Sequence, residues 1–296
     1  MRKAVIDLGT NTFNLLIAEV SEGKFQELYV AREAAMIGDG INDGVISEKA
    51  LIRANRILEK YRAVCDEYGV PSVRCLGTSA LRDASNAAVF KQDVLTKYQF
   101  NIEIISGEDE AQFIYQGIRF IDNFQEPGVI MDIGGGSTEF IHADSKGVNE
   151  LTSLDIGVSR IYQYLEKPEV LSNEHLDRQL RYMESRVSPE FDSMRSSKMI
   201  GASGSFETFL SMLKQESVSR KVHKEPIDKK ELLEVIDWTI HSSLSERMDN
   251  EWIIPIRKYM IPIAAYKVKW AMERLGTERV IISPYSLKEG ALWHNS

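Results

Sequence analysis

The sequence carries one strand–glycine–strand pattern twice, and this repetition constrains the fold more than any other feature. In residues 5–18 and again in residues 129–143, an apolar run leads to an acid, and glycine, a hydroxyl residue and a second apolar run follow. The alignment pairs Asp7 with Asp132, Gly9 with Gly134, Thr12 with Ser137, and Leu16 with Ile141. Further along, the Gly-x-Ser stretch at 77–79 matches another at 201–203 at nearly the same offset. Two matches in the same order indicate an internal duplication, and a repeat of this kind decides the architecture.

Each half is predicted to be an α/β domain. Short runs rich in Val, Ile and Leu indicate strands, and apolar residues three and four positions apart indicate helices. The expected strands are residues 3–9, 12–20, 24–38, 72–77, 102–106, 127–134, 137–143, 148–156, 198–203 and 278–283. The expected helices include 48–68 (capped by Ser47 and stopped by Gly69), 86–99, 108–121, 173–186, 205–215, one opened by Pro226 and continuing to Leu244, 256–275 and 287–294.

We therefore expect two duplicated domains, 1–123 and 124–296, with the last helix free to pack back on the first domain. The polar stretch DNFQEP (122–127) marks the junction. Corresponding glycine turns of two such domains would line one interdomain cleft, and ligands commonly bind in clefts between domains.

Composition and charge narrow the function. The chain has 296 residues, of which 43% are hydrophobic and 27% charged, as in an ordinary soluble globular protein. Its net charge of −8 argues against sequence-independent binding of nucleic acid, which needs clustered Lys and Arg. No apolar run is long enough for a signal peptide or a membrane span, so a cytoplasmic location without membrane contact is expected. Cys65 and Cys75 lie in apolar surroundings without CxxC spacing, and we expect buried free thiols.

The stretch VIMDIGGGSTEF (129–140) interrupts two apolar runs with three consecutive glycines and two flanking acids. Glycine permits positive φ and lets the backbone come close to a ligand. A hairpin with a loose glycine turn would explain the glycines equally well. Asp132 and Ser137 could likewise be ordinary turn residues, so this stretch does not settle its own role.

Five segments together resemble a known family: IDLGTNTFNLLIA, GTSALRDASN, IISGEDEA, DIGGGSTEF and IGASGS. They are similar to the exopolyphosphatase and guanosine pentaphosphate phosphatase family, within the superfamily of acetate and sugar kinases, heat-shock chaperones and actin. The resemblance implies two actin-like (ribonuclease H-like) domains and hydrolysis of phosphoanhydride bonds, and it is compatible with a homodimer. Larger members of the family carry a C-terminal helical extension, whereas this sequence stops soon after its second predicted domain.

Glycine turns and one arginine are the candidates for phosphate binding. Consecutive N–H groups in a glycine loop form a concave anion site, and a helix start also favours anions. The candidate phosphate ligands are Gly9, Thr10, Asn11, Gly134, Gly135, Gly136, Ser137, Gly201, Ser203, Gly204 and Ser205. For residues 201–205 a simple N-capping turn is the alternative. The resemblance adds Arg82, whose guanidinium suits phosphate oxygens, although an ion pair with Asp83 or Asp109 is the simpler interpretation of the sequence alone.

Three acids beside these turns are candidates for a metal ion. Mg²⁺ prefers oxygen ligands and often takes only one or two carboxylates, with waters and substrate phosphates as its other ligands. Asp132 is the first candidate, Glu139 is the second, and Asp7 is expected to act through water. Alternatively, these carboxylates only cap N–H groups of the loops. The sequence leaves open which divalent cation binds and whether a monovalent cation is required.

Hydrolysis also needs a base that activates water. The sequence has no apparent Cys–His or Ser–His constellation, and its five histidines fall outside the motifs. In the family, the glutamate before the alanine of the ISGxxEA-type motif activates water, and Glu110 holds that position. The alternative is that Glu110, like Glu108 and Asp109, only adds negative charge at a helix start.

The leading hypothesis is an enzyme that removes terminal phosphate from inorganic polyphosphate, or the 5′-phosphate of guanosine pentaphosphate, by attack of water activated by Glu110. A kinase that moves a phosphoryl group from ATP to a small acceptor is one alternative, and it needs an adenosine pocket that the sequence does not identify. An actin-like or chaperone-like nucleotide switch is the other.

Overall fold

A computed structural model describes residues 1–39, 44–218 and 226–293. Contacts within the chain divide it into two compact units. Unit 1 comprises Met1–Gly117 and the segment from Leu287, and unit 2 comprises Ile118–Ser286. The predicted boundary lay after residue 123, whereas residues 118–123 belong to unit 2. The last helix belongs to unit 1.

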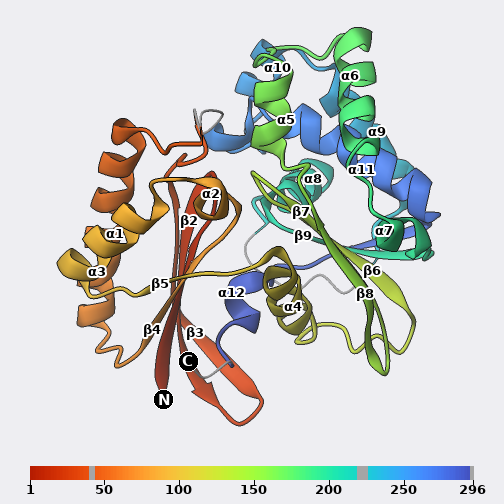
Figure 1. Ribbon diagram of the computed structural model, residues 1–296. Coiled ribbons are helices and arrows are strands. Elements are labelled where there is room, and N and C mark those ends of the chain that lie inside the picture. Colours follow the sequence, from red (N-terminus) through yellow and green to blue (C-terminus); the bar gives the residue numbers. More distant parts are fainter. Residues whose placement is uncertain (40–43, 219–225, 294–296) are drawn as a thin grey trace. The chain divides into compact units, whose positions relative to one another are not determined.

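Unit 1 is built on a five-stranded mixed sheet with the order β3-β2-β1-β4-β5 (Figure 1). The first three strands form an antiparallel meander, and the other two add in parallel beside β1. The strands are β1 (Arg2–Leu8), β2 (Thr12–Ser21), β3 (Lys24–Ala34), β4 (Val73–Gly77) and β5 (Ile102–Ile104). The helices are α1 (Glu48–Glu67), α2 (Ser79–Asp83), α3 (Ala87–Tyr98), α4 (Gly107–Ile118) and α12 (Leu287–Gly290).

Helix α1 shows how local sequence sets these elements. The Ser47 hydroxyl accepts a hydrogen bond from the N–H of Ala50 at 3.3 Å and caps the helix. Gly69 ends it with φ +59°, a left-handed conformation that glycine adopts at little cost. Both predicted ends are therefore confirmed. The buried face of α1 packs on the sheet, where the Tyr61 hydroxyl donates to the carbonyl of Phe13 at 2.8 Å.

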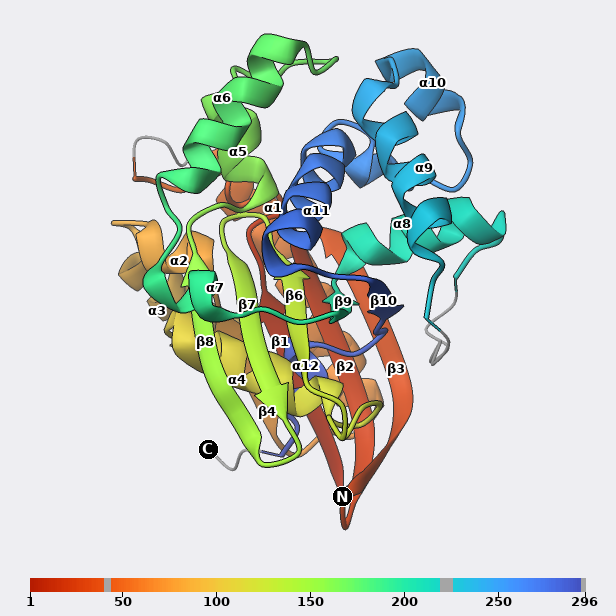
Figure 2. The same ribbon diagram turned by 90° about the vertical axis from the view of Figure 1, so that its right-hand side faces the viewer.

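Unit 2 repeats the arrangement of unit 1 with the order β10-β9-β6-β7-β8 (Figure 2). Its strands are β6 (Gly128–Ile133), β7 (Thr138–Asp144), β8 (Gly147–Leu154), β9 (Lys198–Ala202) and β10 (Arg279–Ile282). The first three are again an antiparallel meander, and the last two are parallel to β6. Because β6 to β10 hold the places that β1 to β5 hold in unit 1, the predicted duplication and the α/β class are confirmed.

The helices of unit 2 are α5 (Val158–Tyr164), α6 (Asn173–Glu184), α7 (Pro189–Ser193), α8 (Gly204–Lys214), α9 (Lys229–His241), α10 (Leu244–Asp249) and α11 (Ile261–Leu275). The region expected to be one helix over 256–275 divides into a 3₁₀ turn, Pro255–Arg257, and α11.

The helix expected to open at Pro226 is placed differently. It begins at Lys229, because the Asp228 carboxylate caps it by accepting two backbone N–H bonds at 2.9 and 3.1 Å. It ends at His241, and a capping box starts the separate helix α10 at Leu244. The prediction of one continuous helix was therefore wrong, since two strong caps lie inside the apolar pattern.

Two further expectations bear on the class of protein. Both cysteines are buried free thiols, as predicted, and burial raises the pKa of the Cys65 thiol to about 11. None of the helices in the described part of the chain combines the length and the apolar character that a membrane crossing needs.

Candidate active site

In unit 1 the β1–β2 turn is held by backbone hydrogen bonds. The N–H of Gly9 donates to the carbonyl of Thr12 at 3.1 Å. The carbonyl of Thr10 accepts from the N–H of Gly38 at 3.0 Å, and the carbonyl of Asn11 accepts from two N–H groups just after β3. A Cβ added at Gly9 would lie 2.9 Å from the carbonyl oxygen of Thr12, so this tight turn requires glycine.

Asp7, at the end of β1, lies in a row of polar side chains across three strands. Asn14 is its direct partner on β2 and donates from Nδ2 to Asp7 Oδ2 at 2.9 Å. Arg32 of β3 continues the row, with Nε donating to Asn14 Oδ1 at 3.2 Å. Burial raises the pKa of Asp7 to about 6, against the lowering effects of the Asn14 hydrogen bond and the charge of Lys288.

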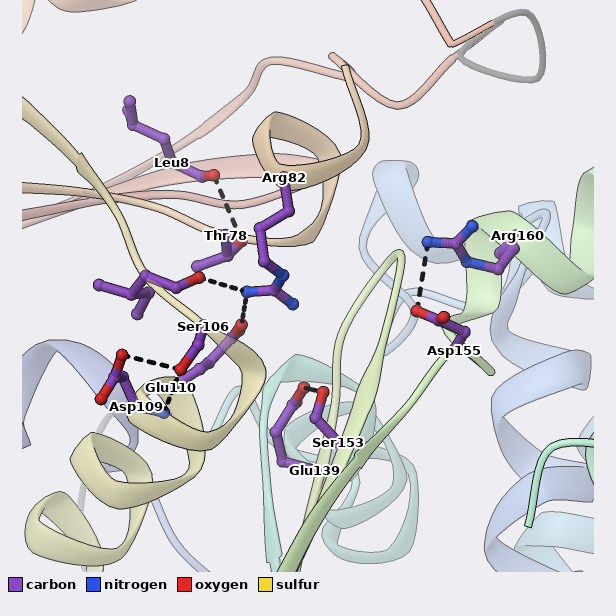
Figure 3. Close-up of polar contacts among 11 residues, drawn as sticks. Leu8, Thr78, Arg82, Ser106, Asp109, Glu110, Glu139, Ser153, Asp155 and Arg160 are labelled. Atoms are coloured by element: carbon purple, nitrogen blue, oxygen red, sulfur yellow. Dashed lines mark hydrogen bonds and ion pairs between the residues drawn. The ribbon is translucent and has the colours of Figure 1, made fainter. Parts of the chain in front are cut away.

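Arg82 and Glu110, which are far apart in the sequence, meet in unit 1 (Figure 3). Arg82 Nη1 donates to Glu110 Oε2 at 2.8 Å and to the carbonyl of Ile105 at 3.0 Å. Both side chains are mostly shielded, with 22% of Arg82 and 12% of Glu110 exposed. Arg82 therefore forms an ion pair with Glu110, whereas the alternative interpretation of the sequence named Asp83 or Asp109 as its partner.

The neighbouring acid Asp109 has a different role. Ser106 Oγ donates to Asp109 Oδ2 at 2.7 Å and accepts the Asp109 N–H at 3.0 Å, just ahead of α4 (Figure 3). This reciprocal pair serves the start of the helix. The acids of the GEDEA stretch are therefore not equivalent, because Asp109 is tied to the helix start whereas Glu110 pairs with an arginine.

In unit 2 the glycine turn between β6 and β7, residues 134–137, is held by all four of its carbonyls. We call these residues the phosphate loop, after the role that the sequence predicts for them. The carbonyls of Gly134, Gly135 and Gly136 accept hydrogen bonds from the start of α5: from Val158 N–H at 3.0 Å, Ser159 N–H at 2.8 Å and Gly157 N–H at 3.1 Å, respectively. The Gly136 carbonyl also accepts from Arg160 Nε at 2.9 Å. The carbonyl of Ser137 accepts from Gly134 N–H at 3.1 Å and closes the turn. Within the described residues, the N–H groups of Gly135, Gly136 and Ser137 make no backbone hydrogen bond. Carbonyls tied to the start of α5 and amides without backbone partners are what an anion-binding turn requires.

Close packing, rather than an unusual dihedral angle, requires glycine where the start of α5 meets the phosphate loop. None of Gly134, Gly135 and Gly136 has positive φ. A Cβ added at Gly157, at the start of α5, would lie 2.2 Å from the carbonyl oxygen of Gly135. The two segments can therefore touch only where side chains are missing.

Asp132 and Glu139 are direct partners across the β6–β7 ladder, so both carboxylates lie on one face of the sheet. Glu139 is buried and accepts from Ser153 Oγ at 2.8 Å (Figure 3). Asp132 accepts from the hydroxyl of Ser286. Two carboxylates side by side next to the phosphate loop form a donor set that suits a hard divalent cation. Among the described residues, no group of three or more His, Cys, Asp or Glu side chains is arranged to hold a metal.

The third predicted turn, at the start of α8, is shaped by packing. A Cβ at Gly201 would lie 2.3 Å from the ring of Phe206, and one at Gly204 would lie 1.6 Å from the guanidinium of Arg257. Ser203, the N-cap, has φ 87° and a buried hydroxyl without a hydrogen-bond partner in the described residues. Ser205 lies in the first turn of the same helix.

Several residues at these sites were missed by sequence reasoning. Asn14 had a signal, because the duplication aligns it with Glu139. Arg160 and Arg257 had no such signal, because each binds a residue that is remote in sequence. Arg160 donates to the carbonyl of Gly136, and Arg257 donates to the hydroxyl of Thr208. Of the five histidines, His223 and His294 lie outside the described residues.

The sequence pattern of the Ppx/GppA phosphatase family matches residues 16–295, and the chain therefore belongs to this family. Phosphatases of this family generally depend on a divalent cation. The recognition made from the five segments is thereby confirmed.

Individual relatives agree with this placement. The chain is 28% identical to a bifunctional 3-dehydroquinate synthase/phosphatase of Fusobacterium nucleatum, over 98% of this chain and 46% of that protein. It is 26% identical to a guanosine-5'-triphosphate,3'-diphosphate pyrophosphatase of Photobacterium profundum, over 98% of this chain and 58% of that protein. The chain thus spans about half the length of the curated relatives it matches.

Solved structures show the same fold. The crystal structure of an exopolyphosphatase from Cytophaga hutchinsonii has a TM-score of 0.93 and 28% identity, covering 99% of this chain and 97% of that one. The Aquifex aeolicus PPX-GPPA enzyme has a TM-score of 0.82 and 23% identity, covering 99% and 98% of the two chains. Two duplicated actin-like domains, as expected from the sequence, are therefore the fold of this chain.

Proposed function

We propose that this chain is a phosphoanhydride hydrolase that releases terminal phosphate from inorganic polyphosphate, the 5′-phosphate of guanosine pentaphosphate, or both. The observation that carries the proposal is the hydrogen bonding of the phosphate loop. All of its carbonyls accept hydrogen bonds within the protein, and its amides lie beside the acid pair Asp132 and Glu139. Family membership and the relatives named as exopolyphosphatase and guanosine-5'-triphosphate,3'-diphosphate pyrophosphatase support it.

In the proposed reaction, Glu110 takes a proton from water, and the water oxygen bonds to the terminal phosphorus. The bond from that phosphorus to the bridging oxygen breaks, and the shortened chain leaves with the electron pair. Arg82 aims the Glu110 carboxylate through Nη1. The hydrogen bonds of Arg82 to Glu110 and Ile105 both use Nη1. We assign Nη2 and Nε to a phosphate oxygen, which a guanidinium binds well.

Phosphate binding is assigned to the three predicted turns, at residues 9–11, 134–137 and 201–205. The cation, Mg²⁺ or another divalent ion, would be held by Asp132 and Glu139, with Asp7 acting through water. A bound cation would neutralise charge on the phosphate oxygens as it develops.

Phosphate release from a substrate panel tests the proposal. The purified chain is given polyphosphate, guanosine pentaphosphate and ATP, each with Mg²⁺ and with chelator. We expect Mg²⁺-dependent orthophosphate from one or both of the first two substrates. Transfer of a phosphoryl group from ATP to a small acceptor would instead identify a kinase. Nucleotide-dependent assembly without phosphate release would identify a switch.

A further inference from the structure

A lysine that no sequence motif indicated lies behind the phosphate loop. Lys267 belongs to α11 and is fully buried. Its ammonium donates to Thr138 Oγ1 at 2.9 Å and to the carbonyl of Ile156. Both acceptors are neutral oxygens.

These contacts place the charge of Lys267 at two anchor points of the loop. Thr138 directly follows the loop, and its hydroxyl donates to the carbonyl of Ser137 at 3.0 Å. Ile156 directly precedes Gly157, whose N–H binds the carbonyl of Gly136. Lys267 therefore joins the two segments that fix the carbonyl side of the loop, while the amides remain for a ligand.

Stability alone does not favour such a residue. Burial lowers the pKa of Lys267 to about 7, against the raising effect of the negative charge on Glu139. The charged form therefore pays a desolvation penalty in the folded protein. A methionine of similar length would fill the same space without that penalty, so the ammonium needs another reason to be there.

We propose that Lys267 is a positioning residue whose buried positive charge raises the affinity of the phosphate loop for phosphate groups. The inference rests on the proposed function, because it assumes that the loop binds phosphate. A protein with net charge −8 has an unfavourable overall field for a polyanion, and the positive charge of protonated Lys267, close behind the loop, offsets it locally. In the low-dielectric interior such a charge acts more strongly than it would at the surface.

Orthophosphate, the expected product, is the probe. Its dissociation constant is measured by calorimetry for the wild type, Lys267→Met, Lys267→Gln and the control Lys269→Met. Lys269 lies on the same helix but is partly exposed and pairs with Asp237 at 2.8 Å. We expect both Lys267 variants to bind phosphate at least about tenfold more weakly, the scale on which groups behind a binding residue act, and the control to bind as the wild type does.

Thermal unfolding separates this role from a structural one. We expect Lys267→Met to keep or raise the melting temperature while it loses phosphate affinity, because replacing a buried charge with a well-packed apolar group is often neutral or stabilising. Wild-type affinity in Lys267→Gln, which keeps a donor but not the charge, would overturn the proposal. So would a loss of affinity that follows loss of stability in both variants. If the wild type itself neither binds orthophosphate nor hydrolyses the substrate panel, the proposed function fails instead.

Discussion

At the residue scale, one difference between the repeats separates their chemistry. Asp7 and Asp132 hold the same place, but the strand partner of Asp7 is Asn14 and that of Asp132 is Glu139. The amide of Asn14 donates to Asp7 and uses one of its oxygens. Glu139 cannot donate in this way when ionised, so we expect the two carboxylates of unit 2 to form the stronger cation site.

Asp132→Ala should therefore weaken metal-dependent activity far more than it alters folding. We expect the Mg²⁺ concentration that gives half-maximal phosphate release to rise by about 10- to 100-fold, with the melting temperature in chelator nearly unchanged. Asp7→Ala is the matched variant from the other repeat, and its effect should be smaller. Normal activity of Asp132→Ala at limiting Mg²⁺ would show that the metal assignment is wrong.

At the element scale, the phosphate loop and the start of α5 form one packed pair. Gly157→Ala would place a methyl group against the carbonyl of Gly135, where only 2.2 Å is available. Because both atoms belong to backbone segments, we expect a loss of about 1–3 kcal/mol in the free energy of unfolding, with weaker phosphate binding. Urea denaturation and phosphate calorimetry measure the two effects.

Gly128→Ala is the control, since its Cβ would meet only the Lys198 side chain at 3.4 Å, an ordinary contact. If the two variants were equally stable and bound phosphate equally well, close packing at Gly157 would not be what shapes the loop.

The same loop shows what sequence reasoning could reach. The hairpin interpretation of its glycines is confirmed, and phosphate binding by its amides, which have no backbone partners in the described residues, stays a prediction. Close packing against the loop requires glycine at Gly157, which the sequence did not reveal, whereas the close approach of the loop glycines to a phosphate stays a prediction. Strands and the ends of α1 were predictable because their signals are local, as at Ser47, whereas the caps at Asp228 and Ser243 were missed inside an apolar pattern.

Contacts between distant segments were not predictable from the chain alone. Lys267 and Thr138 are 129 residues apart in the sequence. The pairing of Arg82 with Glu110 depends on how α2 and α4 follow β4 and β5. A periodic pattern says which face of an element is buried, but not which polar atom lies opposite it.

At the scale of the whole molecule, the acidic charge limits how a long polymer can be held. Retaining a chain of many phosphates needs an extended array of cationic groups, and this chain has 36 Lys and Arg against 44 Asp and Glu. We therefore expect poor processivity on long polyphosphate. On gels of partly digested polymer, the whole population should shorten together.

A full-length band that persists beside free phosphate would contradict this expectation. Repeating the digestion over a range of protein concentrations tests whether two protomers build a channel jointly, because processivity would then rise with concentration.

Hydrolysis by water that Glu110 activates is tested by the turnover rate of Glu110→Gln. Phosphate release from the best substrate is compared for the wild type, Glu110→Gln, Glu108→Gln and Asp109→Asn. Losing a general base should lower kcat by about 10² to 10⁴ with little change in KM, because the amide keeps the shape of the side chain and binding rests on other groups. The other two variants remove the same charge near the helix start and should stay close to the wild type. Equal and small losses in all three would show that these acids only serve the start of α4, and would contradict the account.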